Sequence, residues 1–168
     1  FGHVSGSGGQ ARYASGTLAD GFTAETIASA FIPEYGRYAR LLLDGLGAIQ
    51  IAFEGGLSPS KPEIVVAEPD GVGWSLTPYA NKETVWQYQH TDFALASSPG
   101  GVTHVLYPSD VRLSMAYEVG FSVEKVTVAQ VADQSYTDTP AAVVDADGLV
   151  HTLYLQHQSS TKQLMYSM

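Results

Sequence analysis

A repeat is the feature that most constrains what this chain can fold into. Gly47, Gly101 and Gly148 recur at intervals of 54 and 47 residues, and each is followed by a polar residue after three positions and an aromatic residue after six. The polar residues are Gln50, His104 and His151, and the aromatic residues are Phe53, Tyr107 and Tyr154. A second marker, a glycine before an aromatic residue, keeps the same rhythm at Gly21-Phe22, Gly73-Trp74 and Gly120-Phe121. These markers predict three copies of one structural unit.

Each unit has the residue pattern of short β-strands. Apolar residues alternate over runs bounded by Gly, Pro, Asp and Ser, and no segment has a convincing helical period. We expect four strands per unit, which in the first unit lie near residues 22–28, 38–44, 48–54 and 62–68. The turn between the second and third strands is tight and needs a positive φ, which glycine adopts without steric cost. The sequence therefore predicts an all-β fold.

Units of four short strands are typical of the blades of a β-propeller. We expect residues 1–168 to form one repetitive domain, which is a fragment of a β-propeller. Its three four-stranded antiparallel blades are expected at about residues 21–70, 71–119 and 120–168, with a partial blade at residues 1–20.

The partial blade rests on a match between the two ends of the sequence. Gln10 and Tyr13 have the same spacing as Gln163 and Tyr166, which lie in the last strand of the third unit. Three blades cannot close a ring, since propellers have about four to eight. The expected partner is therefore the chain itself or another propeller fragment, which would complete the ring.

Composition excludes several classes of function. The chain has 17 acidic and 8 basic residues, a formal net charge of −9, so nucleic acid is not an expected partner. The absence of cysteine removes disulfides, cysteine-ligated zinc and thiol nucleophiles, and no cofactor is expected. The apolar runs are too short to insert in a membrane. Because Phe1 is not an initiator methionine, a signal peptide could have been removed, and we expect an extracellular or periplasmic location.

The third unit carries a family resemblance. Its segments Thr139-Pro-Ala-Ala-Val-Val-Asp-Ala-Asp-Gly-Leu-Val-His151-Thr-Leu-Tyr-Leu and Lys162-Gln-Leu-Met-Tyr166 resemble the bacterial sialidase-like (BNR-like) propeller repeats. The resemblance implies a propeller fold, usually in exported proteins that serve as scaffolds or bind glycans. It implies no catalytic residue, because the Asp-box pattern Ser-x-Asp-x-Gly-x-Thr-Trp is absent from every unit.

Two groups of repeated polar residues are candidate sites. His104 and His151 share a repeat position and could line a ligand pocket, or each could hold its own turn through hydrogen bonds. Asp145 and Asp147 look like the opening of a calcium loop, but carboxylates are also ordinary residues of a hairpin turn. The turn is the preferred interpretation, and no metal site is predicted.

An aromatic segment without a repeat counterpart is the third candidate. Trp86, Tyr88 and His90 lie in a variable connection, where aromatic faces and neighbouring amides suit stacking on sugar rings, or packing at an interface. The expected function is a non-catalytic ligand-binding or glycan-binding module, with a structural or protein-interaction scaffold as the alternative. A partial glycosidase that uses Glu25 and Glu124 is a second alternative, since glycosidases use paired carboxylates.

Overall fold

The computed structural model describes residues 9–31, 39–58, 61–81, 93–109, 112–119, 122–130, 135–158 and 160–168. These residues form thirteen β-strands in four sheets, and every strand pair is antiparallel. The prediction of an all-β fold is confirmed. No helix of sufficient length and apolarity to cross a membrane occurs in these ranges.

The sheets follow one another along the chain, and within each sheet the strands pair in sequence order. The first sheet contains β1 (Gly9–Thr17) and β2 (Gly21–Phe31). The second contains β3 (Ala39–Leu43), β4 (Ile49–Ser58), β5 (Lys61–Pro69) and β6 (Trp74–Asn81). The third contains β7 (Ala94–Ser97), β8 (Thr103–Ser109), β9 (Arg112–Val119) and β10 (Ser122–Gln130). The fourth contains β11 (Ser135–Val144), β12 (Val150–Gln158) and β13 (Thr161–Ser167).

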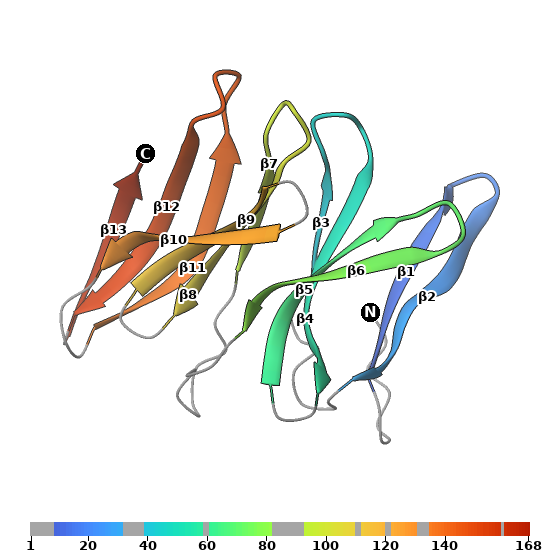
Figure 1. Cartoon of the computed structure of the whole chain (residues 1–168), viewed down its shortest axis with the longest axis horizontal. Helices are drawn as coiled ribbons and strands as arrows, with labels where there is room; N and C mark the ends of the chain where they lie inside the picture. The colour runs from blue at the N-terminus through green and yellow to red at the C-terminus, as the bar shows by residue number, and fades with distance from the viewer. Residues whose placement is uncertain are drawn as a thin grey trace.

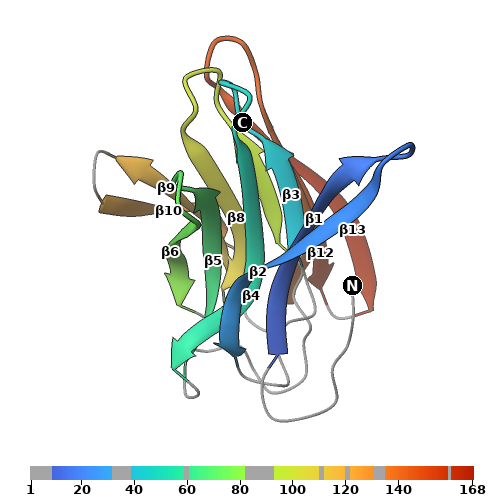
Figure 2. The same cartoon turned by 90° about the vertical axis from the view of Figure 1, so that its right-hand side faces the viewer.

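The four sheets stand in a row (Figure 1). The opening strands of the last three sheets are neighbours, with β7 lying between β3 and β11. Figure 2, turned by 90°, shows the first sheet in front of the second, and β2 contacts β4. The hairpin turns β3–β4, β7–β8 and β11–β12 all lie at the same end of the molecule, at the top of Figure 1. We call this end the turn end.

A separate apolar core fills each space between consecutive sheets. Side chains alternate between the two faces of a strand, so both faces of an inner sheet can be apolar. Ile51 and Phe53 of β4 pack toward the first sheet, whereas Ala52 packs toward the third. In the same way, Val105 of β8 packs toward the second sheet and Leu106 toward the fourth. Each sheet therefore covers a face of its neighbour.

The expected blade boundaries are wrong by one strand. The strand expected to open each unit instead closes the preceding sheet: β2 pairs with β1, β6 with β5, and β10 with β9. The expected boundaries near residues 21, 71 and 120 therefore fall inside hairpins. The physical reason is visible at Asp70, whose Oδ1 accepts hydrogen bonds from the backbone N–H groups of Val72 and Gly73. Gly71 there has a φ of +88°, so residues 70–73 form a tight turn within a sheet.

Candidate functional site

The turn end is built from three copies of the same tight turn. The backbone N–H of its first residue, Asp44, Ser98 or Asp145, donates a hydrogen bond of 2.8–3.0 Å to the carbonyl oxygen of the residue four positions later. The carbonyl oxygen of the first residue accepts a hydrogen bond of 2.9–3.1 Å from the N–H of the glycine three positions later. This glycine has a φ between +84° and +86° in all three copies. The expectation that the turn glycines supply positive φ is confirmed at Gly47, Gly101 and Gly148. It is wrong at Gly45 and Gly100, for which the same expectation held, because neither has a positive φ.

The first side chain of each turn caps the turn itself. Asp44 Oδ1 accepts hydrogen bonds from two backbone N–H groups of its turn, and Ser98 Oγ accepts one. Asp145 Oδ1 likewise accepts hydrogen bonds from the N–H groups of Asp147 and Leu149, both at 2.9 Å. The carboxylate of Asp145 is thus a turn ligand, in agreement with the turn interpretation of this segment.

Two of these turns touch each other. The N–H of Gly45 donates a hydrogen bond of 3.3 Å to Ser97 Oγ in the next sheet. A Cβ atom at position 45 would lie 2.4 Å from the carbonyl oxygen of Ser98. Gly45 is therefore required by this close approach, because it has no positive φ to explain it.

The repeated polar position, three residues after each turn glycine, contacts the third strand of its own sheet. Gln50 of β4 is buried, and its Nε2 donates a hydrogen bond of 2.7 Å to Glu68 Oε1 on β5. His104 of β8 stacks on Tyr117 of β9, with ring centroids 5.8 Å apart. Each of the three residues lies in a different sheet and contacts a neighbour within its own sheet, and their role in a ligand pocket stays a prediction.

His104 is buried at the interface between the third and fourth sheets. Burial lowers the pKa of its imidazole, because desolvation disfavours the charged ring. Its Nδ1 has no hydrogen-bond partner among the described residues. These properties are those of a neutral, packed side chain.

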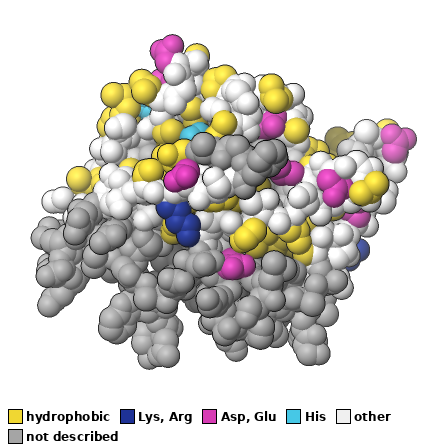
Figure 3. All heavy atoms as spheres, in the orientation of Figure 1, with side chains coloured by type: hydrophobic (Ala, Val, Ile, Leu, Met, Phe, Trp, Pro, Cys, Tyr) yellow, Lys and Arg dark blue, Asp and Glu magenta, His cyan; other side chains and the backbone are white. Residues whose placement is uncertain are grey.

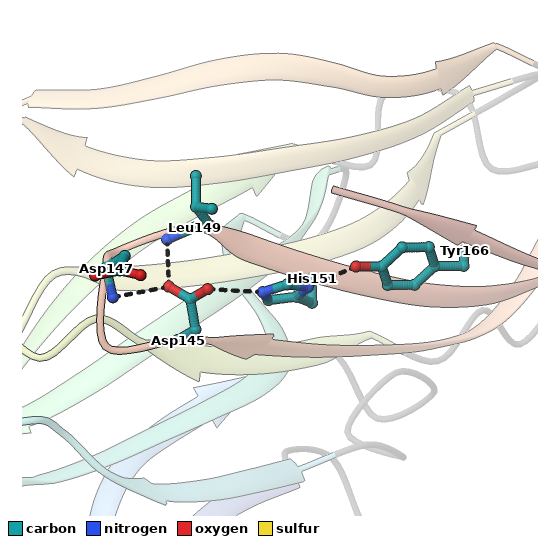
Figure 4. Close-up of polar contacts among 5 residues, drawn as sticks. All are labelled: Asp145, Asp147, Leu149, His151 and Tyr166. Atoms are coloured by element: carbon teal, nitrogen blue, oxygen red, sulfur yellow. Dashed lines mark hydrogen bonds and ion pairs between the residues drawn. The ribbon is translucent and has the colours of Figure 1, made fainter.

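His151 of β12 differs from its repeat counterparts because it is partly exposed (Figure 4). Its Nε2 donates a hydrogen bond of 2.9 Å to Asp145 Oδ2, and Tyr166 Oη lies 2.6 Å from its Nδ1. The rings of His151 and Tyr166 are stacked with centroids 6.0 Å apart. The hydrogen bond from His151, followed by that from the N–H of Leu149, lowers the pKa of Asp145. His151 thus holds its own turn, as one of the two sequence interpretations expected.

The other candidate residues are distributed over the chain. Trp86, Tyr88 and His90 lie outside the described residues, so their role remains a prediction. Glu25 lies on β2 and Glu124 on β10, with the second sheet between the two strands. This placement does not bring the two carboxylates into one glycosidase site.

The described part of the surface offers little chemistry for a metal or an anionic ligand. Within the described ranges, no cluster of three or more His, Asp or Glu side chains could hold a metal ion. Figure 3 shows acidic side chains scattered over the viewed face, and the chain carries a net charge of −9.

Two residues that matter below were not singled out as candidates from the sequence. Phe22 and Tyr166 are large exposed aromatic residues, with 67% and 60% of their surface accessible. Both stand at repeat markers, and that position is the signal that could have identified them. Their repeat counterparts, Trp74 and Tyr13, are partly buried, and a marker residue that is packed in one unit and exposed in another indicates a face with a missing neighbour.

Comparisons with known proteins give little. No family model matches the chain, and no curated protein matches it. The resemblance to sialidase-like repeats therefore remains an expectation. A fucose lectin from Kordia zhangzhouensis, solved with methyl-fucoside, aligns over 76% of this chain and 97% of its own, with 14% identity and a TM-score of 0.43. A superposition of this quality establishes neither a common fold nor a common ligand.

Proposed function

We propose that the four sheets are blades of a β-propeller and that the chain is a non-catalytic module that binds carbohydrate through Trp86, Tyr88 and His90. The observation that carries this proposal is the anchoring of the segment that contains them. Tyr79 and Ala80 precede residues 82–92 and Phe93 follows them, and all three are buried in one core cluster. A connection with both ends fixed in a packed core is a suitable support for binding residues.

The arrangement of the sheets supports the propeller. In that fold, four-stranded meanders are placed radially, and the innermost strands of adjacent blades are neighbours. Strands β3, β7 and β11 have this relation, and consecutive sheets pack face to face through separate cores. The strand that opens each of the last three sheets would then be the innermost strand of its blade.

The chemistry of the segment favours carbohydrate as the ligand. Trp86-Gln-Tyr-Gln-His90 alternates aromatic rings with amide side chains, so it offers both stacking faces and hydrogen-bond donors and acceptors. A protein with a net charge of −9 repels polyanions, which favours a neutral sugar over a phosphorylated ligand.

Glycan-array screening followed by calorimetry tests this proposal. We expect binding to a neutral glycan that is weakened at least tenfold, about 1.4 kcal/mol, by Trp86→Ala or Tyr88→Ala. Val72→Ser is the matched control, because Val72 is an exposed apolar residue in the β5–β6 turn. Binding that survives both aromatic substitutions would remove the named site, and no binding to any glycan would refute the proposed function.

A further inference from the structure

The outward face of the fourth sheet is apolar and exposed. It contains Val143, Leu153, Leu164, Tyr166 and Met168. Leu153 lies five residues after its turn glycine, and the residues at the same position in the second and third sheets are Ala52 and Leu106. Both of these are fully buried by the next sheet, whereas Leu153 is 42% exposed. The fourth sheet therefore has the face that its predecessors cover, but nothing in the described chain covers it.

The outward face of the first sheet carries the complementary feature. Phe22 follows Gly21 at the start of β2, just as Trp74 follows Gly73 at the start of β6. Trp74 faces the preceding sheet, where its ring meets that of Tyr13 edge to face, with centroids 5.4 Å apart. Phe22 has the same position in its sheet, but it is 67% exposed and no sheet of the described residues packs against it.

Tyr13 and Tyr166 are themselves equivalent. They lie on β1 and β13, each three residues after a glutamine, and each faces away from the preceding part of the chain. Among the described residues, Tyr166 on the fourth sheet corresponds to Tyr13 but has no aromatic ring from a following sheet against it. Phe22 on the first sheet corresponds to Trp74 but has no aromatic ring from a preceding sheet of these residues against it.

We propose that the outward face of the fourth sheet docks on the outward face of the first sheet of a second copy, so that Phe22 of the second copy packs on Tyr166. This inference deepens the propeller proposed above by naming the surfaces through which copies associate. The same contact geometry already joins the first and second sheets within one chain, so it continues an established interface. Apolar sheet faces of this kind mark interaction sites.

The imidazole of His151, which contacts Tyr166 on this face, is compatible with burial. The two ring nitrogens of His151 are engaged by Asp145 and Tyr166, so covering the face leaves neither of them without a partner. At the equivalent position Gln50 and His104 are already buried in their sheets. Covering His151 would repeat that arrangement.

The association is head to tail, because the two surfaces differ. Such heterologous contacts form a closed ring when the rotation between copies closes, and an open filament when it does not. A propeller requires the closed form.

Cysteine cross-linking tests the contact directly, because the chain contains no cysteine. Ala24, on the same face as Phe22, and Leu164, on the same face as Tyr166, can be replaced without removing the two rings. A mixture of Ala24→Cys and Leu164→Cys chains with a short bismaleimide is expected to give a band of twice the chain mass. Each variant alone should give none. Adding Tyr166→Ser to the Leu164→Cys chain should reduce the cross-linked yield at least tenfold.

A mixture of Val72→Cys and Leu164→Cys is the matched control, because Val72 is 97% exposed at a turn tip and lies outside the proposed contact. Equal cross-linking in the control, or bands from either variant alone, would overturn the head-to-tail contact. Absence of the mixed band would overturn it as well. Glycan binding without cross-linking would refute this inference alone, whereas cross-linking without glycan binding would refute only the sugar-binding function.

Discussion

Truncation of Leu106 measures how strongly one sheet depends on the next. Leu106 is fully buried between the third and fourth sheets, where it packs with Ala94, Leu113 and Tyr154. Its repeat equivalent Leu153 is 42% exposed, and no sheet of the described residues covers it. Leu106→Ala and Leu153→Ala therefore make the same chemical change at one structural position, with and without a neighbour.

The expected costs differ several-fold. Replacing Leu106 by alanine removes three buried carbon atoms, worth about 2.4 kcal/mol at about 0.8 kcal/mol each. The cavity left between two sheets raises the loss of unfolding free energy to about 3 to 4 kcal/mol. For a chain of this size that corresponds to a fall in Tm of roughly 10 °C. Leu153→Ala leaves no enclosed cavity and should cost about 1 kcal/mol or less, since its side chain is half exposed.

Chemical denaturation and calorimetry of both variants provide the assay. Both should be made in a Phe22→Ser background, because this substitution at the far end of the chain removes the proposed contact between copies. Leu106→Ala should lose at least 2 kcal/mol more than Leu153→Ala. Equal losses would show that the third and fourth sheets do not pack as described, and would refute the reasoning.

Two further predictions concern the turn end and pH. Because burial lowers the pKa of His104, the unfolded chain takes up the proton first, so stability should fall as pH drops below about 6.5. His104→Gln introduces the residue type that stands at the equivalent position 50. This substitution should flatten the dependence of Tm on pH between 7.5 and 5. An unchanged slope would contradict this account. Gly45→Ala should lower stability by about 1 to 3 kcal/mol, because its Cβ would meet Ser98 O at 2.4 Å. Equal melting of this variant and the wild type would exclude the close approach.

Local chemistry could be predicted from the sequence because it depends on residues close together in the chain. The turn glycines are an example, since a tight turn needs the same positive φ in every unit. Alternation of apolar residues similarly identified the strands and the all-β class. These features require no knowledge of which sheets are neighbours.

The grouping of strands into sheets could not be derived from the repeat, because a repeat has the same period wherever its start is placed. Connection length was the better signal. Residues 70–73 are short enough for a hairpin and contain the Asp70-Gly71 pair, whereas residues 82–92 are too long for one. Hairpin chemistry would have placed the boundary of the sheet in the longer connection.

The candidate site was only partly accessible from sequence for a similar reason. His104 and His151 are identical in type and repeat position, yet one is packed between sheets and the other is partly exposed. The difference comes from the presence or absence of a following sheet among the described residues, which neither residue encodes. The contrast between Tyr13 and Tyr166 has the same origin.

The mass of the chain in solution tests the central claim most directly. The chain mass is 17.9 kDa. If the outward faces of the first and fourth sheets bind each other, sedimentation equilibrium at micromolar concentration should give the mass of two or more whole chains. Tyr166→Ser should return the mass to 17.9 kDa. A wild-type mass of 17.9 kDa at every concentration would contradict the account.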